Sequence, residues 1–186
     1  MTNLYVITRI FTFLGTANRA LLEHIVCRLC RIPAEDIRSF RNDELCGHIE
    51  HEFSPKLSHS FLMCWLPFTV NFLLGCCALL SGSFLTFYVG DVSKTSIAFL
   101  WVGFSLICNC APAFEDALLF RDCLFGSKNI LVKIVLAPFF AVAYASAFLE
   151  RYSITFVLSI AFAVVFPHIV TLVFPALHTV VQMFIS

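Results

Sequence analysis

The stretch from Asp43 to Glu52 (DELCGHIEHE) holds two histidines, one cysteine and three glutamates directly before the first long apolar run. His48 and His51 are spaced so that a helix would present both imidazoles on one face. Two imidazoles and one carboxylate around an open position form the ligand set of a hydrolytic zinc ion. Asp116 is the candidate carboxylate, because the topology argued below places it at the same membrane face. The spacing therefore predicts a zinc site formed by His48, His51 and Asp116.

Two other interpretations of these residues stay open. His48, His51 and the neighbouring glutamates could form a solvated loop or an ion-paired helix end, because short His-x-x-His matches are common. Alternatively, Cys27 and Cys30 with Cys46 and His48 approach the spacing of a structural zinc ribbon. Ribbon ligands usually lie on tight turns, whereas Cys27 and Cys30 fall inside a predicted helix.

The composition indicates an integral membrane protein and not a soluble globular one. Of the 186 residues, 60% are hydrophobic and 13% are charged. In a soluble domain about half of the residues are hydrophobic and about a quarter are charged. The formal net charge is zero, but basic residues are concentrated in the first third of the chain, at Arg9, Arg19, Arg28, Arg31, Arg38, Arg41 and Lys56. This asymmetry is a topology signal and gives no reason to expect a nucleic-acid partner. Several of the nine cysteines lie inside apolar runs, which predicts reduced thiols without a disulfide framework.

The first third of the chain predicts an amphipathic helix that lies on the bilayer or dips into it. Residues 1–16 are too short and too basic to span, and they are interpreted as an interfacial lead-in without a removable signal peptide. Thr16 is the predicted N-cap of a helix over 17–31 that Pro33 ends. One side of this helix is apolar and consists of Leu21, Leu22, Ile25, Val26 and Leu29. The other side carries polar residues and cysteines, namely Arg19, Glu23, Cys27 and Cys30. Residues 33–60 form a polar connector, and the lipid bilayer is the expected partner.

Four apolar stretches predict transmembrane helices at about 61–88, 95–115, 129–149 and 153–184, each near or above the roughly 20 residues that cross a hydrocarbon core. The expected fold is an all-α, polytopic membrane protein with an interfacial part over 1–60 and a four-helix transmembrane domain over 61–186. A tight hairpin at Glu150–Tyr152 joins the last two spans. Because basic residues are concentrated before the first span and between the second and third, the positive-inside rule predicts a multi-pass protein with both termini cytoplasmic. The short loops and the absence of a targeting segment favour a bacterial inner membrane.

Polar residues and prolines recur at helical spacing within three of these spans. The sets are Pro67, Asn71 and Gly75; Ser105, Asn109, Pro112 and Asp116; and His168, Thr171, Pro175, His178 and Gln182. Polar side chains inside a membrane are costly unless they face protein or a water-filled cavity. We therefore expect the three stripes to meet in the interior of the bundle, where they would form a groove for a partner transmembrane helix.

Several short motifs lie in an order that resembles a known family. They are Phe13-Leu14-Gly15-Thr16 opening a helix, Gly47-His48 with His51, Pro67 and Asn71, Trp101-x-Gly103-x-Ser105, and Pro112-x-x-Glu115-Asp116-Ala117. This arrangement, spread over residues 11–117, resembles small prokaryotic membrane proteins related to site-2-protease-type zinc metallopeptidases. The resemblance implies a helix with His-Glu-x-x-His, which supplies two zinc ligands and the general base, and an Asp in a later span as another ligand. Asp116 matches that Asp by position.

The sequence departs from this family where the His-Glu-x-x-His motif would fall. It has Arg19-Ala20-Leu21-Leu22-Glu23 there, so both ligand histidines and the base are missing, and Ala20 cannot accept a proton from water. Arg19 and Glu23, four residues apart, would instead form a salt bridge. The resemblance then implies a non-catalytic protein that binds or regulates other membrane segments.

Two alternatives to the non-catalytic function stay open. A rearranged zinc centre built from Glu23, His24, His48, His51 and Asp116 would make the chain an active membrane metalloprotease. A small transporter or metal-handling protein would place its substrate path along Asn71, Asn109, Asp116 and His168.

Overall fold

The chain folds as an all-α protein, as the sequence predicts. The computed structural model describes residues 2–36, 46–88, 90 and 92–185. Residues 43–45 of the His-rich stretch, with Arg38 and Arg41, lie outside this part. The elements, in chain order, are α1 (Thr2–Phe11), α2 (Phe13–Cys30), β1 (Ala34–Asp36), β2 (Glu50–His51), α3 (Leu57–Ser83), the π-helical turn η1 (Phe84–Tyr88), α4 (Lys94–Cys108), α5 (Phe114–Gly126), α6 (Ile130–Arg151) and α7 (Ile154–Ile185). The strands β1 and β2 pair antiparallel.

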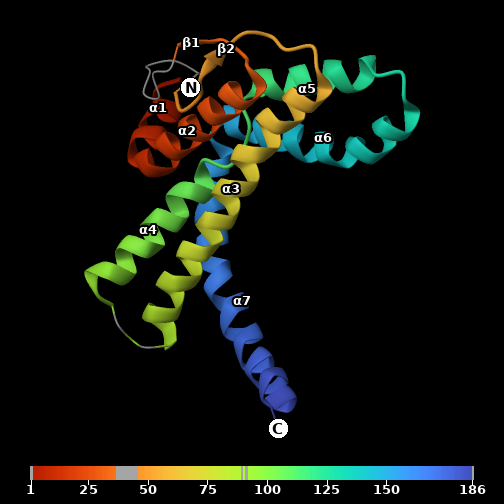
Figure 1. Ribbon diagram of the computed structural model, residues 1–186. Helices are drawn as coiled ribbons and strands as arrows, with labels where there is room; N and C mark the ends of the chain where they lie inside the picture. Colours follow the sequence, from red (N-terminus) through yellow and green to blue (C-terminus); the bar gives the residue numbers. More distant parts are fainter. Residues whose placement is uncertain (1, 37–45, 89, 91, 186) are drawn as a thin grey trace.

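The helices α3 and α4 run side by side and form the centre of the fold (Figure 1). The helices α1 and α2 and the two short strands gather at one end of α3, where α2 packs against both α3 and α4. The helices α5 and α6 pack on each other and project to one side, while α7 packs against α3 and α4 and continues to the far end of the molecule. The N-terminal helices and the end of α7 therefore lie at opposite ends.

The N-terminal part is more helical than the sequence suggests. Residues 2–11 form α1, and α2 begins at Phe13, so Thr16 is not an N-cap. The hydroxyl of Thr16 instead contacts the carbonyl oxygens of Arg9 and Thr12 at 2.9 and 3.0 Å. Threonine commonly bonds back to a preceding carbonyl in this way, and such a bond is compatible with a position inside a helix.

The polar side of α2 is buried and its apolar side is exposed, which is the reverse of a surface helix in a soluble protein. Arg19, Glu23 and Cys27 are buried, whereas Leu21 and Ile25 are exposed. The predicted division into two sides is confirmed for these residues, and the polar side faces the protein, but Val26 of the predicted apolar side is buried beside Cys27.

The predicted span over 95–115 is wrong, because α4 ends at Cys108 and α5 is a separate helix. Pro112 is the local reason, since proline has no N–H to donate and disfavours a helical conformation in the residue before it. Asp116 consequently lies in the first turn of α5, and not at the end of a span. The carbonyl oxygens left free at the end of α4 accept hydrogen bonds from other helices: Asn109 O accepts from Asn71 Nδ2 at 2.8 Å.

Small residues bring α3 and α4 close together. A Cβ atom added at Gly103 would lie 2.7 Å from the backbone nitrogen of Leu79, and one at Gly75 would lie 3.2 Å from the carbonyl oxygen of Gly103. Such small-residue seams allow close approach of helix backbones, which is common among transmembrane helices.

The polar stripes behave differently in the three predicted spans. The stripe at Pro67, Asn71 and Gly75 is buried, and so are Ser105, Asn109, Pro112 and Asp116. The prediction that the stripe on α7 is buried is wrong for His168 and Pro175, because both are exposed. The side chains of Thr171, His178 and Gln182 lie outside the described part.

Within the described part of the chain, the two helical stretches Leu57–Thr86 and Ile130–Arg151 are long and apolar enough to cross a membrane. Length and composition alone are weak evidence for a span, because core helices of soluble proteins pass the same test. The tight turn predicted at Glu150–Tyr152 is present but lies at Tyr152–Ser153, since α6 ends at Arg151 and α7 begins at Ile154.

Replacing Gly15 by alanine tests the close contact between α2 and α4. A Cβ atom at Gly15 would overlap the backbone carbonyl of Ser105, whose hydroxyl also accepts a hydrogen bond from Gly15 N at 2.9 Å. We expect Gly15→Ala to lower stability by about 1–3 kcal/mol, as overpacking does, measured as thermal unfolding in detergent. Gly126→Ala is the matched control, because nothing lies within 4 Å of a Cβ added there. Equal unfolding temperatures for the two variants would contradict the packing described.

Candidate functional site

The stretch with His48 and His51 is not helical. Residues 46 and 47 form a turn, 48 and 49 are irregular, and β2 begins at Glu50. In extended backbone successive side chains point to opposite faces, so residues three apart diverge. The predicted shared helical face is therefore wrong: His48 contacts Glu23 and Glu150, whereas His51 contacts Asp116.

His48 lies between two buried carboxylates that approach opposite edges of its ring. Nδ1 lies 3.0 Å from Glu23 Oε1, and Nε2 lies 3.3 Å from Glu150 Oε1. The second oxygen of Glu23 accepts a hydrogen bond from the backbone N–H of Ile49 at 2.9 Å. Glu23 on α2 therefore fixes the segment of chain that carries His48.

Two buried arginines complete this cluster. Arg19 Nε donates to Glu23 Oε1 at 2.9 Å, which confirms the predicted salt bridge, and Arg19 Nη1 lies 3.4 Å from Glu150. Arg9 forms a second ion pair with Glu150. We call Arg9, Arg19, Glu23, His48 and Glu150 the buried ion cluster. Its two arginines and two glutamates have formal charges that cancel.

Neutral groups of α1, α2 and α4 surround the cluster. The hydroxyl of Tyr5 donates to the carbonyl oxygen of Cys46 at 3.2 Å, and it lies 3.4 Å from Glu150. Asn109 Oδ1 accepts from Arg9 and from the hydroxyl of Thr16. Nη2 of Arg19 is buried and has no hydrogen-bond partner in the described part of the chain.

The charges of the cluster determine the protonation of its members. Burial alone would raise the pKa of Glu23, but His48 and Arg19 lower it to about 2, so this carboxylate is ionised at neutral pH. Burial, followed by the charge of Arg19, lowers the pKa of His48, against the opposing effect of Glu23. A neutral imidazole donates one hydrogen bond, and we assign its proton to Nδ1, which makes the shorter contact.

The buried ion cluster is poorly suited to bind a metal ion. A metal needs ligand atoms that converge on one point, whereas Glu23 and Glu150 contact opposite edges of the His48 ring. Arg9 and Arg19 also place two positive charges beside these carboxylates. Among residues 2–36, 46–88, 90 and 92–185, no group of three or more His, Cys, Asp or Glu side chains is placed to hold a metal.

The remaining predicted ligands, His24 and the cysteines of α2, are also poorly placed to bind a metal ion. His24 is half-buried, and its Nδ1 has no hydrogen-bond partner in the described structure. For the zinc-ribbon alternative, Cys27 and Cys30 lie in α2 as predicted. Burial, followed by the charge of Glu23, raises the pKa of the Cys27 thiol to about 12, which opposes the thiolate that a metal requires.

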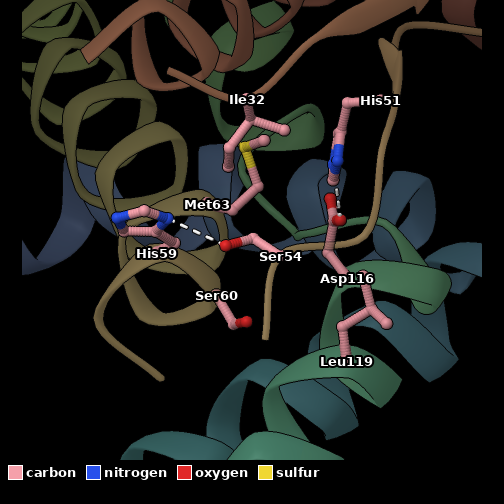
Figure 2. Close-up of a pocket in the computed structure, with 8 residues that line it drawn as sticks. All are labelled: Ile32, His51, Ser54, His59, Ser60, Met63, Asp116 and Leu119. Atoms are coloured by element: carbon pink, nitrogen blue, oxygen red, sulfur yellow. Dashed lines mark hydrogen bonds and ion pairs between the residues drawn. The ribbon is translucent and has the colours of Figure 1, made fainter. Parts of the chain in front are cut away.

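His51 and Asp116 form a second, separate pair at the edge of a small pocket (Figure 2). His51 Nε2 lies 3.0 Å from Asp116 Oδ1, while Nδ1 contacts the carbonyl oxygen of Glu52 at 3.0 Å. Across the pocket, the hydroxyl of Ser54 contacts Nδ1 of His59 at 2.8 Å. His59, which falls within the predicted polar connector over 33–60, is half-buried in the first turn of α3.

This pocket is small and its polar groups already have partners. Its volume of about 10 Å³ is on the scale of one water molecule. Burial lowers the pKa of His51, but the hydrogen bond and charge of Asp116 more than offset this and raise it to about 9. His51 is therefore protonated at neutral pH and forms an ion pair that joins β2 to α5.

Two members of the buried ion cluster, Arg9 and Glu150, and the neighbouring Tyr5 were not identified from the sequence as site residues. Arg9 and Tyr5 fall in the supposed interfacial lead-in, and Glu150 in a supposed turn. One signal was available: Arg9 and Glu150 are charges at the edges of apolar stretches, where an uncompensated charge is costly.

Comparison of the chain with protein-family models, with curated proteins and with solved structures gave no match. The resemblance to site-2-protease-type metallopeptidases therefore stays a prediction from sequence motifs.

Removing one carboxylate tests how strongly the buried ion cluster stabilises the fold. Glu23→Gln leaves the buried Arg19 without its closest counter-ion, and we expect stability to fall by about 3–5 kcal/mol. Asp122→Asn is the matched control, because it breaks an exposed ion pair with Arg121 and should cost less than about 1 kcal/mol. Thermal or denaturant unfolding in detergent measures both. If Glu23→Gln cost no more than the control, the cluster would not be a main determinant of stability.

The His51–Asp116 pair predicts a pH dependence of stability. Folding raises the pKa of His51 from 6.5 to about 9, so the contribution of this pair is complete below about pH 6.5 and is lost as the pH rises through about 9. We expect the unfolding temperature of the wild type to fall over this interval by more than that of His51→Gln. Parallel curves for the two proteins would contradict the assignment, and the NMR titration of His51 gives an independent measurement.

Proposed function

We propose that this chain is an integral, multi-pass membrane protein that acts without catalysis, by binding or regulating other membrane segments. The membrane part of the proposal is supported by the small buried share of the apolar helices. Only 11% of the most apolar window of α6 and 33% of that of α3 are buried. Core helices of soluble proteins are mostly buried, because exposed apolar surface is unfavourable in water.

The non-catalytic part of the proposal rests on one observation, the buried ion cluster. Where the resemblance would place the two zinc-ligand histidines, Arg19 and Glu23 form an ion pair, and Ala20 stands where the general base would be. His48 is held between Glu23 and Glu150, so it has no open side for a substrate or an activated water. These groups stabilise one another, which is the behaviour of a structural cluster.

The proposed partner surface differs from the groove that the sequence suggests. The polar stripes of α3 and α4 are occupied by the chain's own α1 and α2: Asn71 accepts from Asn18 at 2.6 Å, and the hydroxyl of Ser105 donates to the carbonyl oxygen of Thr12 at 2.9 Å. A partner helix would instead bind the outer face of α6. That face exposes large apolar side chains along the helix, namely Ile130, Leu131, Ile134, Val135, Phe139 and Val142.

The proposed orientation places the α1–α2 end at the cytoplasmic face. The concentration of basic residues in the first third of the chain supports this side. The end of α7 lies opposite to α1 and α2 (Figure 1). We therefore propose that the C-terminus lies on the other side of the membrane, in place of the two cytoplasmic termini that the loop charges suggest.

The metal content of the purified protein tests the non-catalytic proposal. We expect the chain to stay in the membrane fraction after alkaline extraction and to carry no stoichiometric metal by elemental mass spectrometry. A chelator should leave its unfolding temperature unchanged, since the described residues form no metal-ligand set. About one zinc ion per chain that is lost in both His48→Ala and Asp116→Ala would contradict the proposal and favour the rearranged metalloprotease.

Photo-crosslinking in native membranes is the second readout of this test. A crosslinker at Val142, exposed on the outer face of α6, should join the chain to a membrane protein at a defined size. The matched control carries it at Ala143, which is buried and should give no such product. Equal products at both positions would contradict a partner surface on α6.

A further inference from the structure

Over a long stretch of α1 and α2, every side chain that is exposed is large and apolar, while the polar Asn18 and His24 are half-buried. From Tyr5 to Cys27, the exposed residues are Ile7, Ile10, Phe11, Phe13, Leu14, Leu21 and Ile25. All charged residues in this stretch, Arg9, Arg19 and Glu23, are buried. The polarity is thus the reverse of that of a helix pair on the surface of a soluble protein.

The helix pair cannot rotate to hide this apolar face. Arg19 and Glu23 are tied to His48 and Glu150 by the contacts of the buried ion cluster. The backbone N–H of Gly15 is tied to Ser105 on α4 at 2.9 Å. Rotation would separate buried charges from their partners, which is strongly unfavourable. The apolar face therefore has to be covered from outside.

The apolar face is continuous with that of the neighbouring helix α4. The ring of Phe13 lies 5.2 Å from the ring of Trp101 on α4, measured between centroids. Ile97 and Phe99, also on α4, are exposed large apolar residues. The same medium that covers α4 can therefore cover α2 without a break.

Exposed charges begin only at the C-terminal end of α2. Arg28 and Arg31 are exposed there, after the last residues of the apolar face. Arginine at the edge of a buried apolar face places its charge among lipid head groups while its alkyl stem stays in the apolar region. Anionic head groups would complement both side chains.

We propose that the apolar face of α1 and α2 lies against the hydrocarbon of the bilayer, with Arg28 and Arg31 at the head groups. This inference rests on the proposed membrane location and adds that the N-terminal helices, which are not spans, are embedded in lipid. A water-soluble protein partner fits less well, because interfaces formed in water carry a polar rim and hydrogen bonds. The exposed side chains between Tyr5 and Cys27 provide neither.

Quenching of a new tryptophan by brominated lipid tests the inference. The variants are Leu21→Trp on the apolar face and, as the matched control, Glu35→Trp at an exposed position of β1. Each is reconstituted in vesicles of phosphatidylcholine and phosphatidylglycerol, with or without brominated acyl chains. Relative to wild type, which carries only Trp65 and Trp101, we expect at least half of the added Leu21→Trp fluorescence to be quenched by brominated lipid. The added Glu35→Trp fluorescence should be quenched by aqueous iodide instead.

Two outcomes would overturn the inference. Quenching of Leu21→Trp by iodide would mean that water covers the face, and protection from both quenchers would mean that protein covers it, as in a dimer. Ile25→Trp, on the same face, gives a second reading if Leu21→Trp does not fold. A chain that resists alkaline extraction but fails this test would leave the proposed membrane location standing, so the two failures can be distinguished.

Discussion

Arg9 and Arg19 lie between the C-terminal ends of two helices, and the rest of the fold depends on this arrangement. At the end of α4 they approach the carbonyl oxygens of Cys108 and Asn109, each at 3.5 Å. At the end of α6 both contact Glu150. The C-terminal end of a helix carries partial negative charge, and the carboxylate adds to it. Without the two arginines, these helix ends could not lie together in a buried place.

The same constraint explains the orientation of the N-terminal helices and the state of His48. Because the arginines must face the helix ends, α1 and α2 turn their apolar residues outward. Glu23 balances Arg19 and also fixes the segment that carries His48. The histidine is consequently enclosed by charges that are already paired. This enclosure is the geometry on which the proposed structural role of the cluster rests.

Some contacts of the site could be predicted from the sequence, because they depend on local spacing. The ion pair between Arg19 and Glu23 follows from a separation of four residues in a helix, and the buried stripe of α3 follows from the cost of polar groups in an apolar segment. The zinc triad was a different kind of inference. It required that residues 46–51 be helical and that Asp116 end a span, and the structure has neither feature. Short turns and helix breaks depend on distant contacts, which spacing cannot reveal.

The sequence by itself determined the all-α class, the apolar character of the helices and the two-sided pattern of α2, because composition and periodicity are properties of local segments. Only the tertiary structure decided which side of α2 is buried, that His48 and His51 belong to different clusters, and that Glu150 joins Arg9 and Arg19. These features bring together residues far apart in the chain, and the contacts of Glu150 with Arg19 and His48 join residues more than 100 positions apart. Their energies come from pairing charges away from water, and a pairing across such a distance leaves no periodic signal in the chain.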